Sequence, residues 1–369
     1  MMRAFRSPVR RLLTLVLNLW PRVALSSAMR ILNLGLGSVL ITTGAWFAGV
    51  FVSDGIVVEA LPIVVALGAI ALVKAVARYI EQVSGHALAF RLLEQMRSAA
   101  FAALSRLAPA WPDTDNSAEV VSRLTADIDR IEVLYAHTVG PALAFAVLAP
   151  LSALAAGLIG GPLAGAVLLS ALVVTGLLLP AAAYRRASGP GMAIRQAHSD
   201  TLVAIVENLR GAEDILQLDA RRQRLDGMAV IARREQDAED RLAMVAAWRD
   251  GAIETLIVTT VLAMAVPGVR GTLPLSEAAT LVALAASSFA PALGLGRAFD
   301  DLPETLASAH RYFELVDTRP AVLFEPGNRV VQTARIYDTA HGADTTLEMS
   351  DVLLYRDGIP VIDGLSLAV

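Results

Sequence analysis

Cysteine is absent from the 369 residues of this sequence, and lysine occurs once, at Lys74. Without cysteine the chain has no disulfide, no thiolate metal site and no cysteine nucleophile. Because no lysine follows Lys74, the sequence holds no phosphate-binding loop of the G-x-x-x-x-G-K-[ST] type, whose lysine contacts nucleotide phosphates. We therefore expect that this chain by itself cannot hydrolyse ATP through such a loop. The net charge of −4 is small, and we expect no nucleic-acid partner.

Long apolar runs fill most of the chain. Apolar residues make up 55% of the sequence, and the mean hydropathy is +0.57. A soluble protein of this size is seldom so apolar, because it must cover its surface with polar groups. Several of the runs approach the ~20 residues that cross a bilayer as a helix. The sequence therefore predicts an integral membrane protein embedded in the lipid bilayer. We place six spans, at 31–52, 56–77, 139–159, 163–184, 252–267 and 276–295.

The segments between these spans alternate in length. Short loops follow the first, third and fifth spans, at 53–55, 160–162 and 268–275. Long segments follow the second and fourth spans, at 78–138 and 185–251. Arginines concentrate in the long segments, so the positive-inside bias places both in the cytoplasm. The N-terminus is also basic, and we expect it to be cytoplasmic and retained rather than cleaved as a signal.

Each long segment has the pattern of a helical hairpin. In the first, Asn116 and Glu119 resemble a capping box at the start of a helix, after a break at 109–115. An apolar stripe with spacings of three and four follows, at Val121, Leu124, Ile128, Ile131 and Tyr135. Such spacing puts the stripe on one helix face. The second segment breaks at Gly211 and then resumes helical character. The predicted fold is thus all-α, with six transmembrane helices and two long cytoplasmic helical hairpins.

The C-terminal part changes character. We interpret 1–316 as the transmembrane domain and 317–346, which contains prolines and glycines, as a linker. Residues 347–369 have the pattern of two short strands joined by a turn at 356–358. Two strands do not form an independent domain. We therefore expect this β hairpin to belong to a larger domain.

Taken together, this organisation resembles a type I ABC exporter half-subunit, and the resemblance covers nearly the whole chain. Residues 355–367 (YRDGIPVIDGLSL) resemble the first hairpin of an ABC nucleotide-binding domain. In that family an aromatic residue near this point stacks on adenine, and Tyr355 is the matching candidate. An ordinary strand aromatic is the alternative. The resemblance implies ATP as cofactor and a phosphate-binding loop shortly after Val369, so the sequence is expected to stop early in that domain.

Within the exporters, the sequence resembles the C subunits of CydDC-type transporters, which support assembly of cytochrome bd oxidase. The segments that carry this resemblance are 44–47 (GAWF), 74–97, 122–143, 208–220 (NLRGAEDILQLDA) and 311–320 (RYFELVDTRP). The resemblance implies a heterodimer with a D-type ABC exporter subunit in the bacterial cytoplasmic membrane. It implies reduced thiols, glutathione and cysteine, as small-molecule cargo, and haem as a further ligand or cargo.

Three charged residues are candidates for the substrate pathway. Lys74, Arg78 and Glu81 have spacings of four and three, so they share one face of the second span. Charges near a membrane are costly and normally face a cavity or a partner. One interpretation is a polar wall that attracts an anionic cargo. The alternative is that these side chains extend to the lipid headgroups and pair among themselves.

His86 lies on the same helix, beyond Glu81. A neutral imidazole is a competent axial ligand of haem iron. A lone histidine on a helix is more often an ordinary surface or core residue. The match of His86 to the histidine of the resembled subunits makes it the candidate haem ligand, and no other metal site is expected.

The two cytoplasmic turns match the coupling helices of the family, which rest on the nucleotide-binding domains. The candidate contact residues there are Asp113, Asp115, Glu213 and Asp214, and Gly211 is expected to permit the reversal of the chain. Solvated turn residues are the alternative.

Three functions remain open at this level. The first is a transport subunit of an ABC exporter for thiols or haem. The second is an exporter half for lipid or peptide cargo, and the third is a membrane scaffold without transport.

Overall fold

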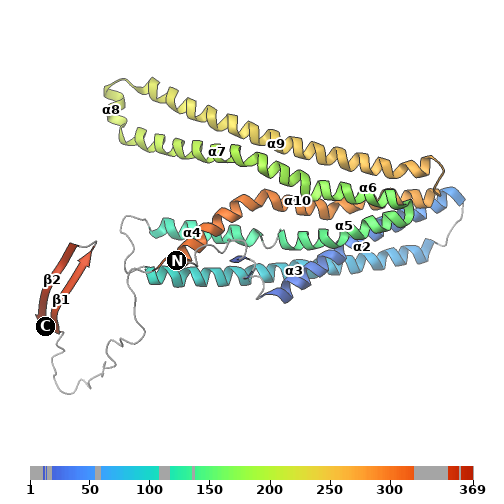
Figure 1. The fold of residues 1–369 in the computed structure, drawn as a ribbon, viewed down its shortest axis with the longest axis horizontal. Coiled ribbons are helices and arrows are strands. Elements are labelled where there is room, and N and C mark those ends of the chain that lie inside the picture. The colour runs from blue at the N-terminus through green and yellow to red at the C-terminus, as the bar shows by residue number, and fades with distance from the viewer. Residues whose placement is uncertain are drawn as a thin grey trace, which may run out of the picture. The chain divides into compact units, whose positions relative to one another are not determined.

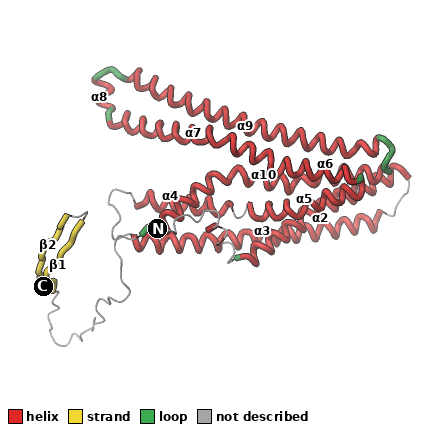
Figure 2. The backbone as a smooth tube through the Cα atoms, in the orientation of Figure 1, coloured by secondary structure: helices red, strands yellow, loops and turns green. Residues whose placement is uncertain are grey.

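The computed structural model describes residues 11–12, 14, 19–54, 60–107, 117–134, 138–319, 348–356 and 359–368. The chain divides into two compact units, Met1–Arg319 and Pro320–Val369. The first unit is helical, and the second contains one pair of strands among its described residues (Figure 2).

The first unit consists of long helices joined by short connections (Figure 1). In chain order they are α2 (Trp20–Asp54), α3 (Ala60–Leu107), α4 (Ser117–Leu134), α5 (Gly140–Gly160), α6 (Pro162–Val173), the π-helix η3 (Val174–Leu178), α7 (Leu179–Arg210), α8 (Ala212–Gln217), α9 (Arg221–Val269) and α10 (Leu275–Asp317).

Six of these helical stretches are long and apolar enough to cross a membrane, and they contain the predicted spans. The start of the second predicted span, 56–59, lies outside the described residues. Apart from α5, which has the length of its predicted span, the helices are longer than the spans. The second runs from Ala60 to Leu107, and the fifth from Arg221 to Val269. The all-α membrane fold with six candidate spans is therefore confirmed.

The most enclosed helix is α10, of whose most apolar window 56% is buried, against 6% for α2 and α3. One apolar cluster lies where α3, α4 and α10 meet, and includes Leu92, Ile128 and Tyr312. A second lies where α5, α6 and α10 meet, and includes Leu172 and Phe289. Residues of α10 belong to both clusters, so this helix connects the two apolar cores of the helical unit.

Most of the apolar stripe predicted on α4 belongs to the first cluster. Leu124, Ile128 and Ile131 are buried, with 9%, 2% and 0% exposure. Val121, by contrast, is 52% exposed. The periodicity predicts which residues share a face of the helix, but it does not predict how far along that face the neighbouring helix extends. Tyr135 and the predicted cap Asn116 lie outside the described residues.

The second predicted hairpin consists of α7, α8 and α9, and α7 and α9 run beside each other to α8 (Figure 1). The helix α7 ends at Arg210, and Gly211, where the break was predicted, is its C-cap. Gly211 has φ −94°, which any residue adopts. The residue with positive φ in this turn is instead Asp219, at 48°. Gly211 therefore does not supply a left-handed conformation. Its lack of a side chain matters for spacing, since a Cβ would lie 3.2 Å from the Glu207 carbonyl oxygen.

The predicted fourth span is not one uniform α-helix. It is divided by η3, and within it Thr175 is 0% exposed and its hydroxyl has no hydrogen-bond partner. The π-helix packs against α10, where a Cβ on Gly176 would lie 3.3 Å from Ala292 Cα. A π-helical turn carries an extra residue relative to the α-helix.

In the second unit, β1 (Glu348–Arg356) pairs antiparallel with β2 (Ile359–Ala368), so the predicted strand pair is confirmed. Its register is irregular on both sides of Val352. Asp351 has φ 50°, and its backbone N–H donates to Ser366 Oγ at 3.1 Å. The register shifts and the positive φ together form a local bulge in β1.

Candidate functional site

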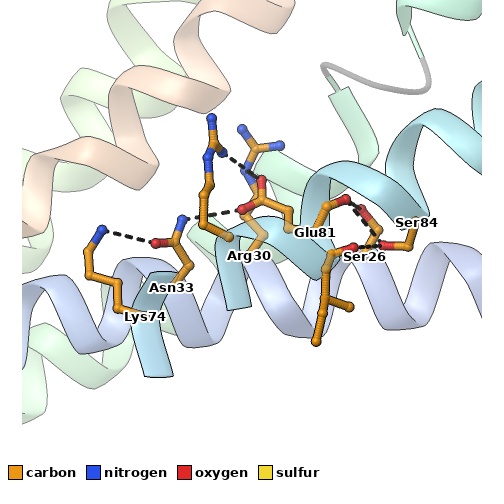
Figure 3. Close-up of polar contacts among 8 residues, drawn as sticks. Ser26, Arg30, Asn33, Lys74, Glu81 and Ser84 are labelled. Carbon is orange, nitrogen blue, oxygen red and sulfur yellow. Dashed lines mark hydrogen bonds and ion pairs between the residues drawn. The ribbon is translucent and has the colours of Figure 1, made fainter. Parts of the chain in front are cut away.

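A network of polar side chains joins α2 and α3 within otherwise apolar sequence (Figure 3). At its centre, Glu81 of α3 is 5% exposed. Its carboxylate accepts hydrogen bonds from Asn33 Nδ2 at 3.2 Å and from Arg78 Nη1 at 3.1 Å. Arg30 Nε of α2 lies 3.7 Å from the same carboxylate. Glu81 is therefore a buried carboxylate with three polar neighbours, as a charge near a membrane requires.

Asn33 connects Lys74 to this carboxylate. Its side chain is 5% exposed, and its oxygen accepts a hydrogen bond from Lys74 Nζ at 3.0 Å. Its nitrogen donates to Glu81. The two contacts together fix the orientation of the amide, since only the oxygen accepts and only the nitrogen donates. The amide therefore carries an ordered chain of contacts from the lysine to the carboxylate.

Two matching sets of residues form this network. On α3, Lys74, Arg78 and Glu81 have spacings of four and three; Arg78 donates to Glu81, and Lys74 is connected to Glu81 through Asn33. On α2, a second set has the same spacings: Ser26, Arg30 and Asn33. Ser26 Oγ donates to the Glu81 carbonyl oxygen at 3.3 Å. The α2 residues were not predicted, although three polar residues at helical spacing in an apolar run are a signal that the sequence contains.

Two glycines leave room for the long cationic side chains. A Cβ on Gly37 of α2 would lie 3.1 Å from Lys74 Cε. A Cβ on Gly140, at the start of α5, would lie 3.3 Å from Arg30 Nη1. The side chain of Lys74 thus passes over a bare stretch of α2 to reach Asn33, and Arg30 lies against α5.

His86 belongs to a different face of α3. Four residues with spacings of four, three and four lie on this face, and all are exposed: Tyr79, Val83, His86 and Phe90. The rings of His86 and Phe90 are stacked, with centroids 6.3 Å apart. This stripe is an exposed, mainly apolar surface with one imidazole. Among the described residues, no three His, Cys, Asp or Glu side chains are grouped to hold a metal ion.

The second predicted coupling turn forms the tip of the α7–α9 hairpin. Glu213 and Asp214 lie in the first turn of α8 and are exposed. Leu216 and Leu218 beside them are 62% and 78% exposed. A groove of about 840 Å³ lies between α7 and α9 behind the tip. The first predicted turn, with Asp113 and Asp115, lies outside the described residues.

Tyr355 lies in β1 opposite Pro360. Its predicted contact with adenine stays a prediction, because the structure contains no nucleotide and describes only the backbone pairing at this position.

The far end of α10 has contacts that the sequence did not predict. Arg311 makes a two-bonded ion pair with Asp127 of α4, and its Nε lies 2.9 Å from Asp127 Oδ2. Tyr312 donates to the backbone oxygen of Met96 on α3 at 3.0 Å. Arg11 near the N-terminus makes a two-bonded ion pair with Asp317 and lies over the ring of Phe313, 4.0 Å from its centroid. These contacts fasten α10 to three other parts of the chain.

This arrangement of six long apolar helices with helical extensions agrees with a family comparison. Residues 24–271, more than half of the chain, match the ABC transporter transmembrane region. The chain therefore belongs to the ABC transporter transmembrane family.

Three curated relatives match this chain individually. The chain is 28% identical over 263 residues to a probable ABC transporter ATP-binding/permease protein of Haemophilus influenzae, covering 70% of this chain and 47% of the relative. It is 24% identical over 318 residues to the glutathione/L-cysteine transport system ATP-binding/permease protein CydC of H. influenzae, covering 84% and 54%. It is 25% identical over 258 residues to CydC of Escherichia coli K12, covering 69% and 45%. The chain thus spans about half the length of these relatives.

Proposed function

We propose that this chain is the transmembrane subunit of an ATP-driven exporter in the bacterial cytoplasmic membrane, and that its cargo is a small anionic thiol such as glutathione. The observation that carries the proposal is the polar network between α2 and α3. It gathers Arg30, Lys74 and Arg78 around one carboxylate, Glu81. Positive charge at a membrane-spanning helix pair attracts anions. The relatives named as glutathione and L-cysteine transport proteins support the same cargo class.

A second subunit is part of the proposal. The extended parts of α7 and α9 contact mainly each other among the described residues. Large apolar side chains on them are exposed: Leu202, Val206, Leu209, Met244 and Trp248. Exposed large apolar side chains that gather on one surface mark interaction sites. We assign them to a D-type partner subunit, with the chain's N-terminus in the cytoplasm.

ATP supplies the energy in this proposal. The relatives are ATP-binding/permease proteins. In the proposed arrangement the β1–β2 hairpin belongs to a nucleotide-binding domain, and Tyr355 stacks on adenine. The exposed tip at α8 transmits closure of the nucleotide-binding domains to the spans, through Glu213, Asp214 and, in the other turn, Asp113 and Asp115.

Haem is a second candidate ligand, favoured by the stripe of Tyr79, His86 and Phe90. If haem binds, it would supply an iron that an imidazole nitrogen can ligate. His86 would provide that nitrogen, and the two aromatic side chains would cover the porphyrin face.

Uptake by inside-out proteoliposomes tests the function. The full-length chain would be reconstituted with its partner subunit and given labelled glutathione or L-cysteine. We expect saturable glutathione accumulation with ATP and none with ADP. Movement of a fluorescent lipid or a peptide, without either thiol, would replace this cargo class by the lipid or peptide alternative. No movement of any of these cargoes would favour a scaffold.

A further inference from the structure

The charges of the α2–α3 network do not balance. Formally it contains three cations, Arg30, Lys74 and Arg78, and one carboxylate, Glu81. Arg30 and Arg78 both pair with Glu81. In the part of the chain that the structure describes, Lys74 has no carboxylate within ion-pair distance and bonds only to the neutral Asn33 amide. Two positive charges are therefore uncompensated in an environment where unpaired charge is costly.

Lys74 and Arg78 lie one helical turn apart on α3 and keep donors that the network does not use. A lysine ammonium has three N–H donors, and one of those of Lys74 is used by Asn33. Arg78 has five N–H donors. Its Nη1 donates to Glu81, and Nη1 and Nη2 also face the Gln82 amide oxygen at 3.1 and 2.8 Å, which leaves the remaining donors of this side chain, 52% exposed, for a ligand. Glu81, in contrast, is buried at 5% exposure. An incoming anion can reach the cations while the internal carboxylate stays in place.

We propose that Lys74 and Arg78 form a carboxylate subsite for the cargo, and that Glu81 is its internal counterion, which competes with the cargo for the same cations. This rests on the proposed function and sharpens it. The subsite selects cargo with net negative charge. Glutathione has two carboxylates and one ammonium and carries about one net negative charge at neutral pH. Cysteine is a zwitterion with a net charge of about zero. The network therefore favours glutathione over cysteine.

The internal counterion gives the site a distinctive response to mutation. If the network only tied α2 to α3, every change in it would weaken the protein and lower transport of all cargoes alike. If Glu81 competes with cargo, its neutralisation frees the cations, and glutathione binds more tightly. The two roles thus predict opposite signs for one substitution.

The test uses the full-length chain with its partner subunit in proteoliposomes. Three probes are compared by cargo-stimulated ATPase activity: glutathione, glutathione diethyl ester, in which both carboxylates are blocked, and L-cysteine. We expect glutathione to act at a concentration at least tenfold lower than the ester. Lys74→Gln should raise the half-maximal glutathione concentration about tenfold and change that of cysteine less than twofold. Lys74→Arg should restore most of the glutathione response.

Glu81→Gln should lower the half-maximal glutathione concentration several-fold. Because this change leaves three cations unpaired, folding is checked by thermal unfolding. If the single variant does not fold, the pair Lys74→Gln with Glu81→Gln, which keeps a net charge of +2, is compared with Lys74→Gln alone and should bind glutathione more tightly. Arg91→Gln is the matched control, since Arg91 is an exposed cation of α3 that pairs with Glu94 outside the network.

Equal responses to glutathione and its ester, or an equal loss for all probes in Lys74→Gln, would overturn the subsite. A different result would show that the proposed thiol cargo is wrong while the subsite is right. If no thiol stimulates the wild-type protein, oxidised glutathione and succinate are tested as anions without a thiol. A response to these that Lys74→Gln weakens would retain the carboxylate subsite and remove the thiol cargo. No response to any anion would remove both.

Discussion

Arg311 and Asp127 are 184 residues apart in the chain, and the guanidinium of one makes two hydrogen bonds to the carboxylate of the other. The Asp127 side chain is 7% exposed, and Arg311 supplies hydrogen-bond donors to both of its carboxylate oxygens. The pair joins α10 to α4 beside the apolar cluster of Ile128 and Tyr312. It is more buried than the exposed Arg130–Glu304 pair, which joins the same two helices.

Removal of this partner should destabilise the helical unit. In Arg311→Ala the buried carboxylate of Asp127 loses its donors, which costs about 1–3 kcal/mol. The midpoint of thermal unfolding in detergent should fall accordingly. The control is Arg97→Ala, which breaks the exposed pair with Asp129, whose side chains are 55% and 53% exposed. Exposed pairs contribute roughly 0–1 kcal/mol, so similar shifts in both variants would contradict the assignment.

The crossing of α2 and α10 should not tolerate a side chain at Gly49. A Cβ there would lie 2.4 Å from Ser276 Cα, so the two backbones must move apart. Overpacking of this kind costs about 1–3 kcal/mol, and Gly49→Ala should lower the unfolding midpoint. Gly44 lies on the same helix, and a Cβ there meets no atom within 4 Å. Gly44→Ala should be neutral or stabilise by up to about 1 kcal/mol. Equal losses in the two variants would contradict the close approach at Gly49 as the cause, because helix propensity alone stabilises both.

The tip of the α7–α9 hairpin should affect coupling and not folding. Leu216 is 62% exposed in α8, so Leu216→Asp disturbs no packed core. If the tip rests on a nucleotide-binding domain, the aspartate should reduce cargo-stimulated ATPase activity of the full-length complex at least fivefold and leave the unfolding midpoint unchanged. Val269→Asp is the control at the other end of α9, where Val269 is 86% exposed. A coupling defect in both variants, or in neither, would argue against this contact.

His86→Ala tests the haem candidate. We expect the full-length heterodimer, purified after expression with haem precursors, to show a Soret band that His86→Ala removes. The matched control is His198→Ala, because His198 is an exposed histidine on α7 that lies 3.6 Å from Glu235. An unchanged band in His86→Ala would exclude this imidazole as the ligand. No band in the wild-type protein would exclude haem from the preparation altogether.

The sequence predicted those features that depend on one helix at a time. Apolar runs identified the spans, and spacing placed Lys74, Arg78 and Glu81 on one face, where the structure connects them. Arg30 and Asn33 were not predicted as their partners, because pairing depends on the relative shift of α2 along α3. That shift results from tertiary packing, and a single-helix pattern carries no information about it.

The turn after α7 gives a second example. Gly211 was expected to permit the reversal, yet the positive φ falls on Asp219. Aspartate tolerates this conformation better than most residues, so glycine is not the only turn signal.

The π-helix η3 has a consequence for how faces of the fourth span are counted. An extra residue in one helical turn rotates everything after it by about 100° relative to an uninterrupted α-helix. A wheel drawn through α6 and continued past Leu179 would assign α7 residues to the wrong sides. The extra residue thus shifts which positions along the sequence share a face of the helix. The α7 side chains that pack along α9 are therefore to be counted from Leu179 onward and not carried over from α6.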